Sequence, residues 1–365
     1  MQSERYIVFK PDLVLELVNK HKKTFEALKA LETELQARYY SMNEAIRAML
    51  LAAATGESLL LIGPPGTAKS SLVRTFCSYL GIDPADEEDH DYFEYLLTQF
   101  TEPSELFGYY DLLQAQKSGE LKRKSDGMIQ EARIVYLDEV FNASSAILNS
   151  LLAMMNERFY HERGEVFYAK LEVLYGATNN IPESDDLRAF FDRFLLRYRV
   201  DNVRAEHQDM ADMLPMGWGT TYNSDRTLNL SERNGNGNSA PNSKANTTLL
   251  NDLREFRLDV DTYANSLLAD AREAQQGSNF YASLALFVKA TRYYRLAEMS
   301  NRRLVKFMNL LLVNLVYRMC SENLTSKTDA SMRHEDFALL RYMLDTPSIP
   351  EFHADKLPPL KVKSW

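Results

Sequence analysis

The stretch Gly63-Pro-Pro-Gly-Thr-Ala-Lys-Ser70 decides the fold of this 365-residue chain. It follows an apolar run, Ser58–Ile62, and opens a helical pattern, which is the setting of a phosphate-binding loop. Glycines let backbone N–H groups turn toward an anion, and the N-terminus of the following helix adds partial positive charge. The sequence therefore predicts a nucleotide-phosphate site formed by Gly63, Pro64, Pro65, Gly66, Thr67, Ala68, Lys69, Ser70 and Ser71.

Two side chains of this loop carry the expected chemistry. Lys69 would reach the β- and γ-phosphates of ATP, and the Ser70 hydroxyl would hold Mg²⁺. Ala68 stands where a glycine is usual, and its methyl group is tolerated if the local φ is negative. We therefore expect ATP and Mg²⁺ as the ligands of the loop.

A second motif ends a later apolar run, Ile134–Leu137, with two carboxylates, Asp138 and Glu139. The carboxyl ends of parallel strands share one edge of a sheet, where ligands bind in open α/β folds. We expect Asp138 to hold Mg²⁺, directly or through water, and Glu139 to polarise the attacking water. Such a pair is a weak signal alone, and the phosphate loop upstream strengthens it.

From Ser58 to about residue 204, apolar runs alternate with helical patterns. This alternation is typical of a parallel sheet with helices on both faces, so we expect an α/β fold. Helical spacing predicts helices that begin near Lys69, Pro103, Ser144 and Asp185. The predicted strands are Ser58–Ile62, Tyr92–Thr98, Arg133–Leu137, Leu171–Ala177 and Leu196–Val200.

Helical patterns flank this region on both sides. A leading helix is predicted over 12–40, and a second runs from Asn43 to Thr55 and stops at Gly56. After a stretch rich in Gly, Ser and Asn, the later helices are predicted over Leu253–Ala274, Phe280–Glu298, Arg302–Met319 and Glu335–Leu344. We divide the chain into an N-terminal helical extension (1–40), an α/β nucleotide-binding domain (41–204), a linker with a flexible insertion at 215–250 (205–252), an all-helical lid domain (253–345) and a C-terminal tail (346–365).

Composition narrows the function and the compartment. The chain has 51 acidic and 42 basic residues, and its net charge of −9 disfavours general attraction to nucleic acid or anionic membranes. The start, MQSERYIVFK, has no apolar core of signal-peptide length, and the most apolar stretch, Phe307–Tyr317, is too short to span a bilayer. Cys77 and Cys320 are predicted to be buried free thiols, as in a reducing compartment. We therefore expect a cytoplasmic protein.

The run LDEVFNASSAILNSLLAMMNERFYHERG, from Leu137 to Gly164, resembles the MoxR family of AAA+ ATPases, as do GPPGTAKS before it and GATNNIPE after it. Within that family the sequence is most similar to the RavA branch. The likeness covers residues 40–204 well and residues 295–345 more thinly, and alanine before the loop lysine is common in the family. The resemblance implies a AAA+ P-loop parallel sheet flanked by helices and followed by an all-α lid domain.

The resemblance also implies roles for residues beyond the two motifs. Asn179, or its neighbour Asn180, would sense the γ-phosphate at the end of a strand. Arg193 would be the arginine finger that neutralises charge on the γ-phosphate of the adjacent subunit, with Arg197 as the alternative. A nucleotide site completed by a neighbour requires a ring.

Three further features are carried over from the family. Arg302, or the adjacent Arg303, would be the second sensor and would reach the nucleotide of its own subunit. Residues 103–131 resemble the family's helix-2 insert, and Arg158–Leu171 looks like a second hairpin before the sensor strand. We expect both to face partners, with basic residues near the tip of the insert: Lys117, Lys122, Arg123 and Lys124.

The function implied is Mg²⁺-dependent ATP hydrolysis by a homo-oligomeric ring, with six subunits expected. The ring would act like a chaperone, remodelling or maturing a protein client complex together with a von Willebrand factor A domain companion. Two alternatives stay open. A nucleic-acid-acting ring motor shares the insert, and a nucleotide-bound scaffold would hydrolyse little ATP.

Overall fold

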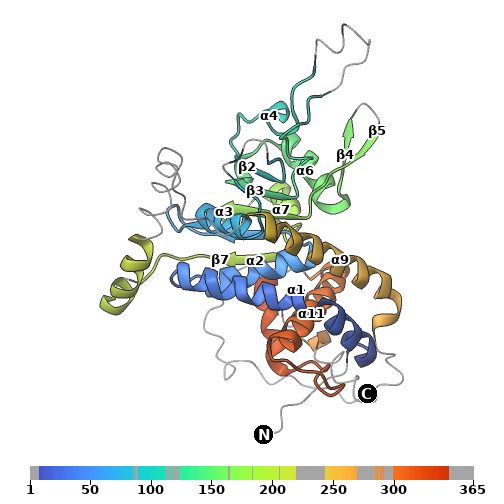
Figure 1. Cartoon of the computed structure of the whole chain (residues 1–365). Helices are drawn as coiled ribbons and strands as arrows, with labels where there is room; N and C mark the ends of the chain where they lie inside the picture. Colours follow the sequence, from blue (N-terminus) through green and yellow to red (C-terminus); the bar gives the residue numbers. More distant parts are fainter. Residues whose placement is uncertain are drawn as a thin grey trace.

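The computed structural model describes residues 8–84, 86, 89–111, 116, 123–162, 165–182, 184–204, 206–218, 243–268, 284–286, 288–289, 291 and 299–344. A sheet with flanking helices forms one half of the molecule, and a bundle of long helices forms the other (Figure 1). From the sheet half projects an antiparallel hairpin, β4 (Phe159–Glu162) and β5 (Glu165–Tyr168). The hairpin expected within Arg158–Leu171 is therefore present.

Five parallel strands form the central sheet in the order β2-β3-β6-β1-β7. Ile62 at the end of β1 lies opposite Thr178 of β6 and Arg199 of β7, so the segments that follow these strands meet at one edge. The prediction of a parallel α/β sheet is confirmed, with strand boundaries that differ by at most two residues. The strands are β1 (Leu59–Ile62), β2 (Tyr92–Leu96), β3 (Ile134–Asp138), β6 (Val173–Thr178) and β7 (Leu196–Arg199).

Side chains of the strands alternate between two hydrophobic cores, one on each face of the sheet. On β1, Leu59 and Leu61 belong to the core that continues into the helical half, whereas Leu60 and Ile62 belong to the core on the other face. Because both faces are buried, β1 and most of β3 and β6 are continuous apolar runs, whereas the edge strands β2 and β7 include charged residues.

Short helices cover both faces of the sheet and position the loops at its edge. The first face is covered by α2 (Asn43–Thr55) and α3 (Lys69–Tyr79). The second face is covered by α4 (Pro103–Phe107), the 3₁₀ turn η1 (Val140–Asn142), α6 (Ser145–Glu157) and α7 (Asp185–Phe191). The predicted helix starts are confirmed to within one residue.

The helical half contains α9 (Ser243–Leu267), α11 (Asn301–Ser321) and the 3₁₀ segment η2 (His334–Met343), with α1 (Pro11–Arg38) packed along α9 and α11. The ring of Phe25 on α1 lies edge-on to Phe256 of α9 and to Tyr317 of α11, with centroids 4.9 and 6.3 Å apart. His21 Nε2 lies 2.7 Å from the Asp259 carboxylate. The N-terminal helix therefore shares one core with the lid helices.

Parts of the lid differ from the sequence prediction. Helix α9 begins ten residues before the predicted start at Leu253, and residues 207–218 are helical within the predicted linker. The segment predicted as the helix Glu335–Leu344 is the 3₁₀ segment η2. Most of the predicted helix Phe280–Glu298, most of the insertion 215–250 and the tail from 345 lie outside the described residues.

Glu32 is a buried carboxylate that joins α1 to the lid. It accepts hydrogen bonds from Lys29 Nζ (2.7 Å) and from the Tyr317 hydroxyl, and Arg47 Nη1 lies 3.7 Å away. Burial alone raises the pKa of Glu32, but these hydrogen bonds and the charge of Arg47 outweigh it, so the pKa falls below its ordinary value of 4.5. A lowered folded-state pKa means that the ionised form stabilises the fold.

We expect Glu32→Gln to lower the free energy of unfolding by about 2 kcal/mol near neutral pH, because it removes a buried, hydrogen-bonded charge. The stabilisation is fully present above the ordinary pKa and is lost as the pH falls through the lowered one. Urea unfolding at several pH values should therefore show the gap between variant and wild type closing on acidification. Glu26→Gln on the same helix, where Glu26 is exposed, should change little at any pH.

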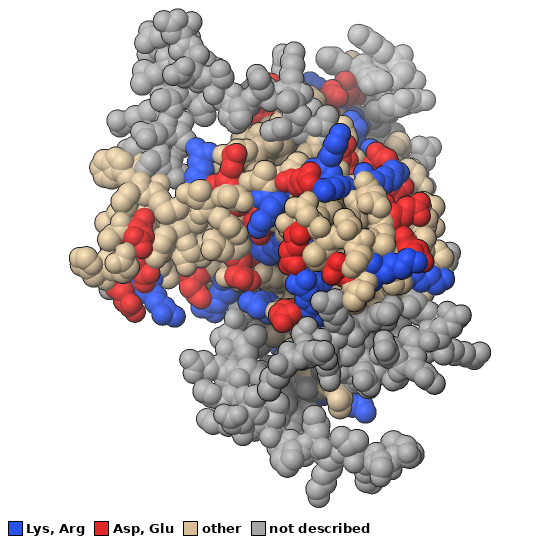
Figure 2. Space-filling view, turned by 60° about the horizontal axis from the view of Figure 1, so that its bottom comes forward, with Lys and Arg blue, Asp and Glu red and all other residues tan. Residues whose placement is uncertain are grey.

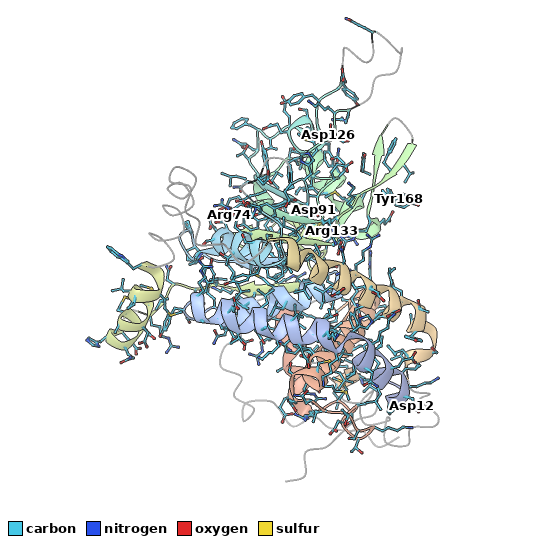
Figure 3. All side chains as sticks on the ribbon, viewed as in Figure 1. Asp12, Arg74, Asp91, Asp126, Arg133 and Tyr168 are labelled. Carbon is cyan, nitrogen blue, oxygen red and sulfur yellow. The ribbon has the colours of Figure 1, made fainter. Side chains whose placement is uncertain are left out.

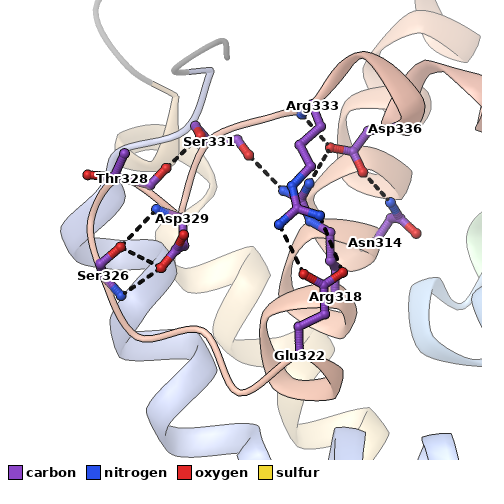
Figure 4. Close-up of polar contacts among 9 residues, drawn as sticks. All are labelled: Asn314, Arg318, Glu322, Ser326, Thr328, Asp329, Ser331, Arg333 and Asp336. Atoms are coloured by element: carbon purple, nitrogen blue, oxygen red, sulfur yellow. Dashed lines mark hydrogen bonds and ion pairs between the residues drawn. The ribbon is translucent and has the colours of Figure 1, made fainter. Parts of the chain in front are cut away.

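A polar network holds the end of the lid against α11 (Figure 4). Asp336 accepts from the backbone N–H of Arg333 (2.7 Å) and from Asn314 Nδ2 (2.9 Å). Arg318 Nη2 donates to the Ser331 carbonyl (2.7 Å), which fixes the loop before η2. These bonds anchor η2 to α11.

Helix α11 is the apolar centre of the lid. Among the described residues, it is the one helix that is long and apolar enough to cross a membrane. However, 61% of its most apolar 18-residue segment is buried inside the protein. Cys320 on α11 and Cys77 on α3 are buried free thiols, as predicted. The burial of α11 identifies it as a core helix.

Candidate functional site

The phosphate loop lies at the carboxyl edge of the sheet, between β1 and α3. At Gly63 the backbone of β7 passes so closely that a Cβ atom would sit 2.0 Å from the Val200 carbonyl oxygen. The Val200 N–H donates to the Ile62 carbonyl (2.7 Å), so the end of β7 holds the start of the loop. Only glycine fits at position 63, which explains the first glycine of the motif.

Lys69, the first residue of α3, is buried at the mouth of the loop. Its Nζ donates to the carbonyls of Gly63 (2.7 Å) and Pro64 (2.9 Å), so the ammonium group stays inside the loop. Burial lowers the pKa of Lys69, and the charges of Asp138 and Glu139 act in the opposite direction. The two predicted motifs therefore lie close enough to influence each other electrostatically.

Three side chains from adjacent strands meet beside the loop. Glu139 Oε1 accepts a hydrogen bond of 2.5 Å from Asn179 Nδ2, and Asp138 Oδ1 accepts from the Glu139 backbone N–H at 3.0 Å. Burial raises the pKa of Glu139, as does the neighbouring charge of Asp138. The sequence alternative Asn180 contributes its carbonyl to the Thr178 hydroxyl, and its side chain is exposed.

Ser70 and Asp138 offer the donors that suit a magnesium ion. Within the described residues, no hydrogen bond occupies the Ser70 hydroxyl or the Asp138 Oδ2 atom, and hydroxyl and carboxylate oxygens are ligands that Mg²⁺ prefers. No group of three or more His, Cys, Asp or Glu in the part of the chain described forms a closed metal cage. This donor set fits an ion that takes its remaining ligands from phosphates and water.

Ala68 has a backbone φ of +59° and ψ of 22°, in the left-handed region. The expectation that this alanine is tolerated through a negative φ is therefore wrong. The chain must reverse here to bring Lys69 into the first turn of α3, and the left-handed conformation does this at a cost that glycine would not incur.

We expect Ala68→Gly to raise the free energy of unfolding by about 1 kcal/mol, because it relieves the left-handed strain. Ala30→Gly is the matched control: Ala30 is exposed in the middle of α1, so the same substitution should destabilise by about 1 kcal/mol. Urea unfolding measures both changes. Loss of stability at both positions would contradict the strain at Ala68.

Arg193 and Arg197, the two candidate fingers, have different surroundings. Arg197 is 4% exposed, and its guanidinium donates to the carbonyls of Phe191 (2.9 Å) and Phe194 (3.1 Å). Arg193 is half-buried, and its Nε atom has no hydrogen-bond partner. It precedes the amino end of β7, at the edge of the sheet opposite the phosphate loop. Backbone carbonyls therefore hold the guanidinium of Arg197 in the core, whereas Arg193 Nε has no such partner.

The two candidate second sensors lie beside Arg193. Arg303 is 3% exposed and donates from Nη1 to Asp192 (3.3 Å) and from Nη2 to the Met343 carbonyl (2.5 Å). Arg302 is exposed and lines a small cavity together with Arg193 and Lys306. The structure thus groups Arg302 with Arg193, not with the phosphate loop. The sequence analysis missed the binding of Arg303 to Asp192, because nothing in the spacing pairs residues 111 positions apart.

The helix-2 insert and the hairpin both expose aromatic side chains. Tyr109 at the base of the insert is 64% exposed, and Tyr168 on β5 is 82% exposed. Arg123 returns to the base of the insert, where its guanidinium lies 4.5 Å from the ring centroid of Tyr110. Lys117, Lys122 and the Arg163–Gly164 turn lie outside the described residues.

The strand order, the phosphate loop after β1 and the Asp-Glu pair after β3 define a P-loop nucleotide-binding domain of the α/β class. Residues 26–234 match the family model described as bpMoxR, "MoxR domain in the MoxR-vWA-beta-propeller ternary systems". Because this match covers more than half of the sequence, the chain belongs to the MoxR family of AAA+ ATPases. The match does not assign it to the RavA branch, which stays a prediction.

Several other proteins are similar to this chain. Two uncharacterized proteins of Methanocaldococcus jannaschii are each 37% identical over 178 residues, covering 49% of this chain and 45% and 46% of theirs. A structural protein of Acidianus two-tailed virus is 28% identical over 187 residues, covering 49% of this chain and 29% of its own length. The chain spans less than half the length of these curated relatives. A crystal structure of a "putative ATPase" from Cytophaga hutchinsonii is 18% identical with a TM-score of 0.48, covering 91% of this chain and 88% of that one.

Proposed function

We propose that the protein hydrolyses ATP with Mg²⁺ at the carboxyl edge of the sheet. The observation that carries this proposal is the hydrogen bond from Asn179 to Glu139. Glu139 also lies close enough to Lys69 for the two charges to interact. Glu139 would orient and polarise the attacking water, and Asn179 would hold that carboxylate while sensing the γ-phosphate. Lys69 would bind the β- and γ-phosphates, and Ser70 with Asp138 would hold the ion that neutralises developing charge.

The proposed site is completed by a neighbouring subunit in a ring, expected to be a hexamer. Arg193 supports this because it lies at the opposite edge of the sheet from its own phosphate loop and has an unpartnered guanidinium atom. In a ring, this edge of one subunit faces the loop of the next, so Arg193 would stabilise the transition state there. Arg302 was expected to reach the nucleotide of its own subunit; because it lines the same small cavity as Arg193, we propose instead that it approaches the neighbouring nucleotide.

The ring would use this hydrolysis to remodel or mature a protein client together with a von Willebrand factor A domain companion. The family description supports the companion, since it names systems of MoxR, vWA and β-propeller proteins. The exposed aromatic residues of the insert and hairpin are suited to protein contacts. Acidic and basic side chains are interspersed on the face in Figure 2, which gives nucleic acid no extended basic track there. We retain a cytoplasmic location in this proposal.

ATP turnover per subunit, measured against protein concentration, tests this function. We expect turnover to rise steeply with concentration, because each site needs a neighbour, and to vanish when Mg²⁺ is chelated. Glu139→Gln should bind ATP but lose turnover by about a hundredfold or more. Wild-type turnover that is flat and near zero at all concentrations, also with a vWA companion added, would favour the nucleotide-bound scaffold instead.

A further inference from the structure

A cavity in the described part of the chain lies away from the phosphate loop. It has a volume of about 560 Å³ and lies where the amino ends of β3 and β6 meet α9. The end of α2 at Gly56 and the end of α6 at Arg158 complete its wall. Figure 3 labels Arg133, Asp91 and Tyr168 in this region, beside α9 and the hairpin. A cavity of this size accommodates a small organic molecule.

The lining of this cavity has an excess of positive charge. Arg133 and Arg257 both bind Glu172, and Arg133 Nη1 also lies 3.6 Å from the Asp91 carboxylate. Lys170 pairs with Glu131, 2.8 Å away, and Arg254 is exposed with no carboxylate partner among the residues described. Five lining residues are basic and two are acidic, namely Arg133, Arg158, Lys170, Arg254 and Arg257 against Glu172 and Asp261.

Arg158 is a cation of this group that no carboxylate hydrogen-bonds among the residues described. Its Nη2 donates only to backbone carbonyls, those of Gly56 (2.5 Å) and Glu172 (3.3 Å). Its Nη1 atom is fully buried and has no hydrogen-bond partner. Burial lowers the pKa of Arg158 to about 10, and the charges of Glu57 and Glu172 oppose this shift without cancelling it.

A second residue of the lining also has a buried atom without a partner. Asn309 Oδ1, from α11, is buried without a hydrogen-bond donor. Buried polar atoms without partners are rare in folded proteins, because each costs free energy that a hydrogen bond would recover. Arg158 and Asn309 both belong to the lining, so a ligand with an anionic group and a hydrogen-bond donor would pair with these two atoms once the side chains turn toward it.

We propose that this cavity is a second anion site, which binds a small molecule carrying phosphate or carboxylate groups. Arg158 and Arg254 would bind the anionic groups, and Asn309 would accept from a hydroxyl or amino group of the ligand. The site is separate from the phosphate loop, because it lies at the opposite edge of the sheet.

Binding there would fasten the lid to the ATPase core. Arg254 belongs to α9 and Asn309 to α11, whereas Arg158 joins the end of α6 to the hairpin. A bound anion would therefore bridge the helical half and the sheet half, and it would oppose any motion of one against the other.

Calorimetric titration of pyrophosphate and of citrate into Lys69→Ala protein tests the proposal, because this variant removes the competing phosphate loop. We expect saturable binding of at least one probe, and the pair distinguishes phosphate from carboxylate ligands. Adding Arg158→Gln should weaken that binding about tenfold or more, since it removes a charged hydrogen-bond donor. Arg254→Gln, at an exposed position that folding does not need, should weaken it about two- to fivefold.

Lys23→Gln is the matched control, because Lys23 is exposed on α1 and its loss changes the net charge equally. It should leave the affinity unchanged. Absence of saturable binding for both probes would overturn the proposal, as would equal affinities in the Arg158, Arg254 and Lys23 variants. Displacement of the probe when the subunits assemble would also overturn the proposal. It would instead indicate that the cavity binds acidic side chains of a second copy of the chain. Neither result depends on ATP turnover, so the proposed function is tested separately.

Discussion

Protein carrying Lys69→Ala is expected to lose ATP binding, with an affinity at least a hundredfold below that of the wild type. The buried ammonium is already held at the mouth of the loop by the carbonyls of Gly63 and Pro64. It would therefore meet the β- and γ-phosphates without reorganisation, and its loss removes charge-assisted hydrogen bonds in a partly desolvated site. Equilibrium binding of a fluorescent ATP analogue measures the change.

Arg74→Ala is the control for this variant. Arg74 lies further along the same helix, where its guanidinium binds Glu94 on β2, at 2.7 and 2.8 Å. Its removal takes the same charge from α3 without touching the loop, so ATP binding should persist. Retained affinity in Lys69→Ala protein, with a normal unfolding curve, would show that the nucleotide binds elsewhere.

Protein carrying Arg193→Ala is expected to bind ATP normally and to hydrolyse it about a thousandfold more slowly, since an arginine finger acts on the transition state. Mixing it with Glu139→Gln protein should restore part of the activity. In a mixed ring, the intact Arg193 of the Glu139→Gln subunit would complete the intact site of the Arg193→Ala subunit. Turnover of the two pure proteins and of their mixture is the measurement.

Two results would place the finger elsewhere. One is wild-type turnover in Arg193→Ala protein, and the other is a mixture no more active than its components. Arg197→Ala provides the contrast: Arg197 caps the carbonyls of Phe191 and Phe194 and its guanidinium lies 3.8 Å from the ring centroid of Phe191. Its loss should lower stability by about 3 kcal/mol through unpaired buried carbonyls and lost packing.

The sheet and the phosphate loop were predictable because their signals are local. Ser58–Ile62 is apolar along its whole length, as a strand buried on both faces must be, and the loop glycines follow it directly. The family resemblance placed Asn179 at the end of the strand beside the Asp138 strand, and its hydrogen bond to Glu139 was found only in the structure. These features need no knowledge of contacts between distant parts of the chain.

Features that depend on distant contacts were not predictable. The left-handed backbone of Ala68 was not predicted, although glycine, the residue that adopts this conformation most readily, is usual at that position. Arg303 was indistinguishable from Arg302 in the sequence, yet only Arg303 is buried against Asp192. Arg158 and Asn309, each with a buried unpartnered atom, line one cavity although they are far apart in the chain.

The packing of α1 against α9 and α11 has a consequence for how the chain acquires its structure during synthesis. Helix α1 is synthesised before α9 and α11, the helices that cover its apolar face. The contact of His21 with Asp259 joins residues that are 238 positions apart. Contacts of such long sequence separation form slowly, because a large loop must close before they are gained. Nascent chains that end before α11 would therefore present an uncovered apolar helix at their N-terminus, a target for aggregation and for the chaperones that prevent it.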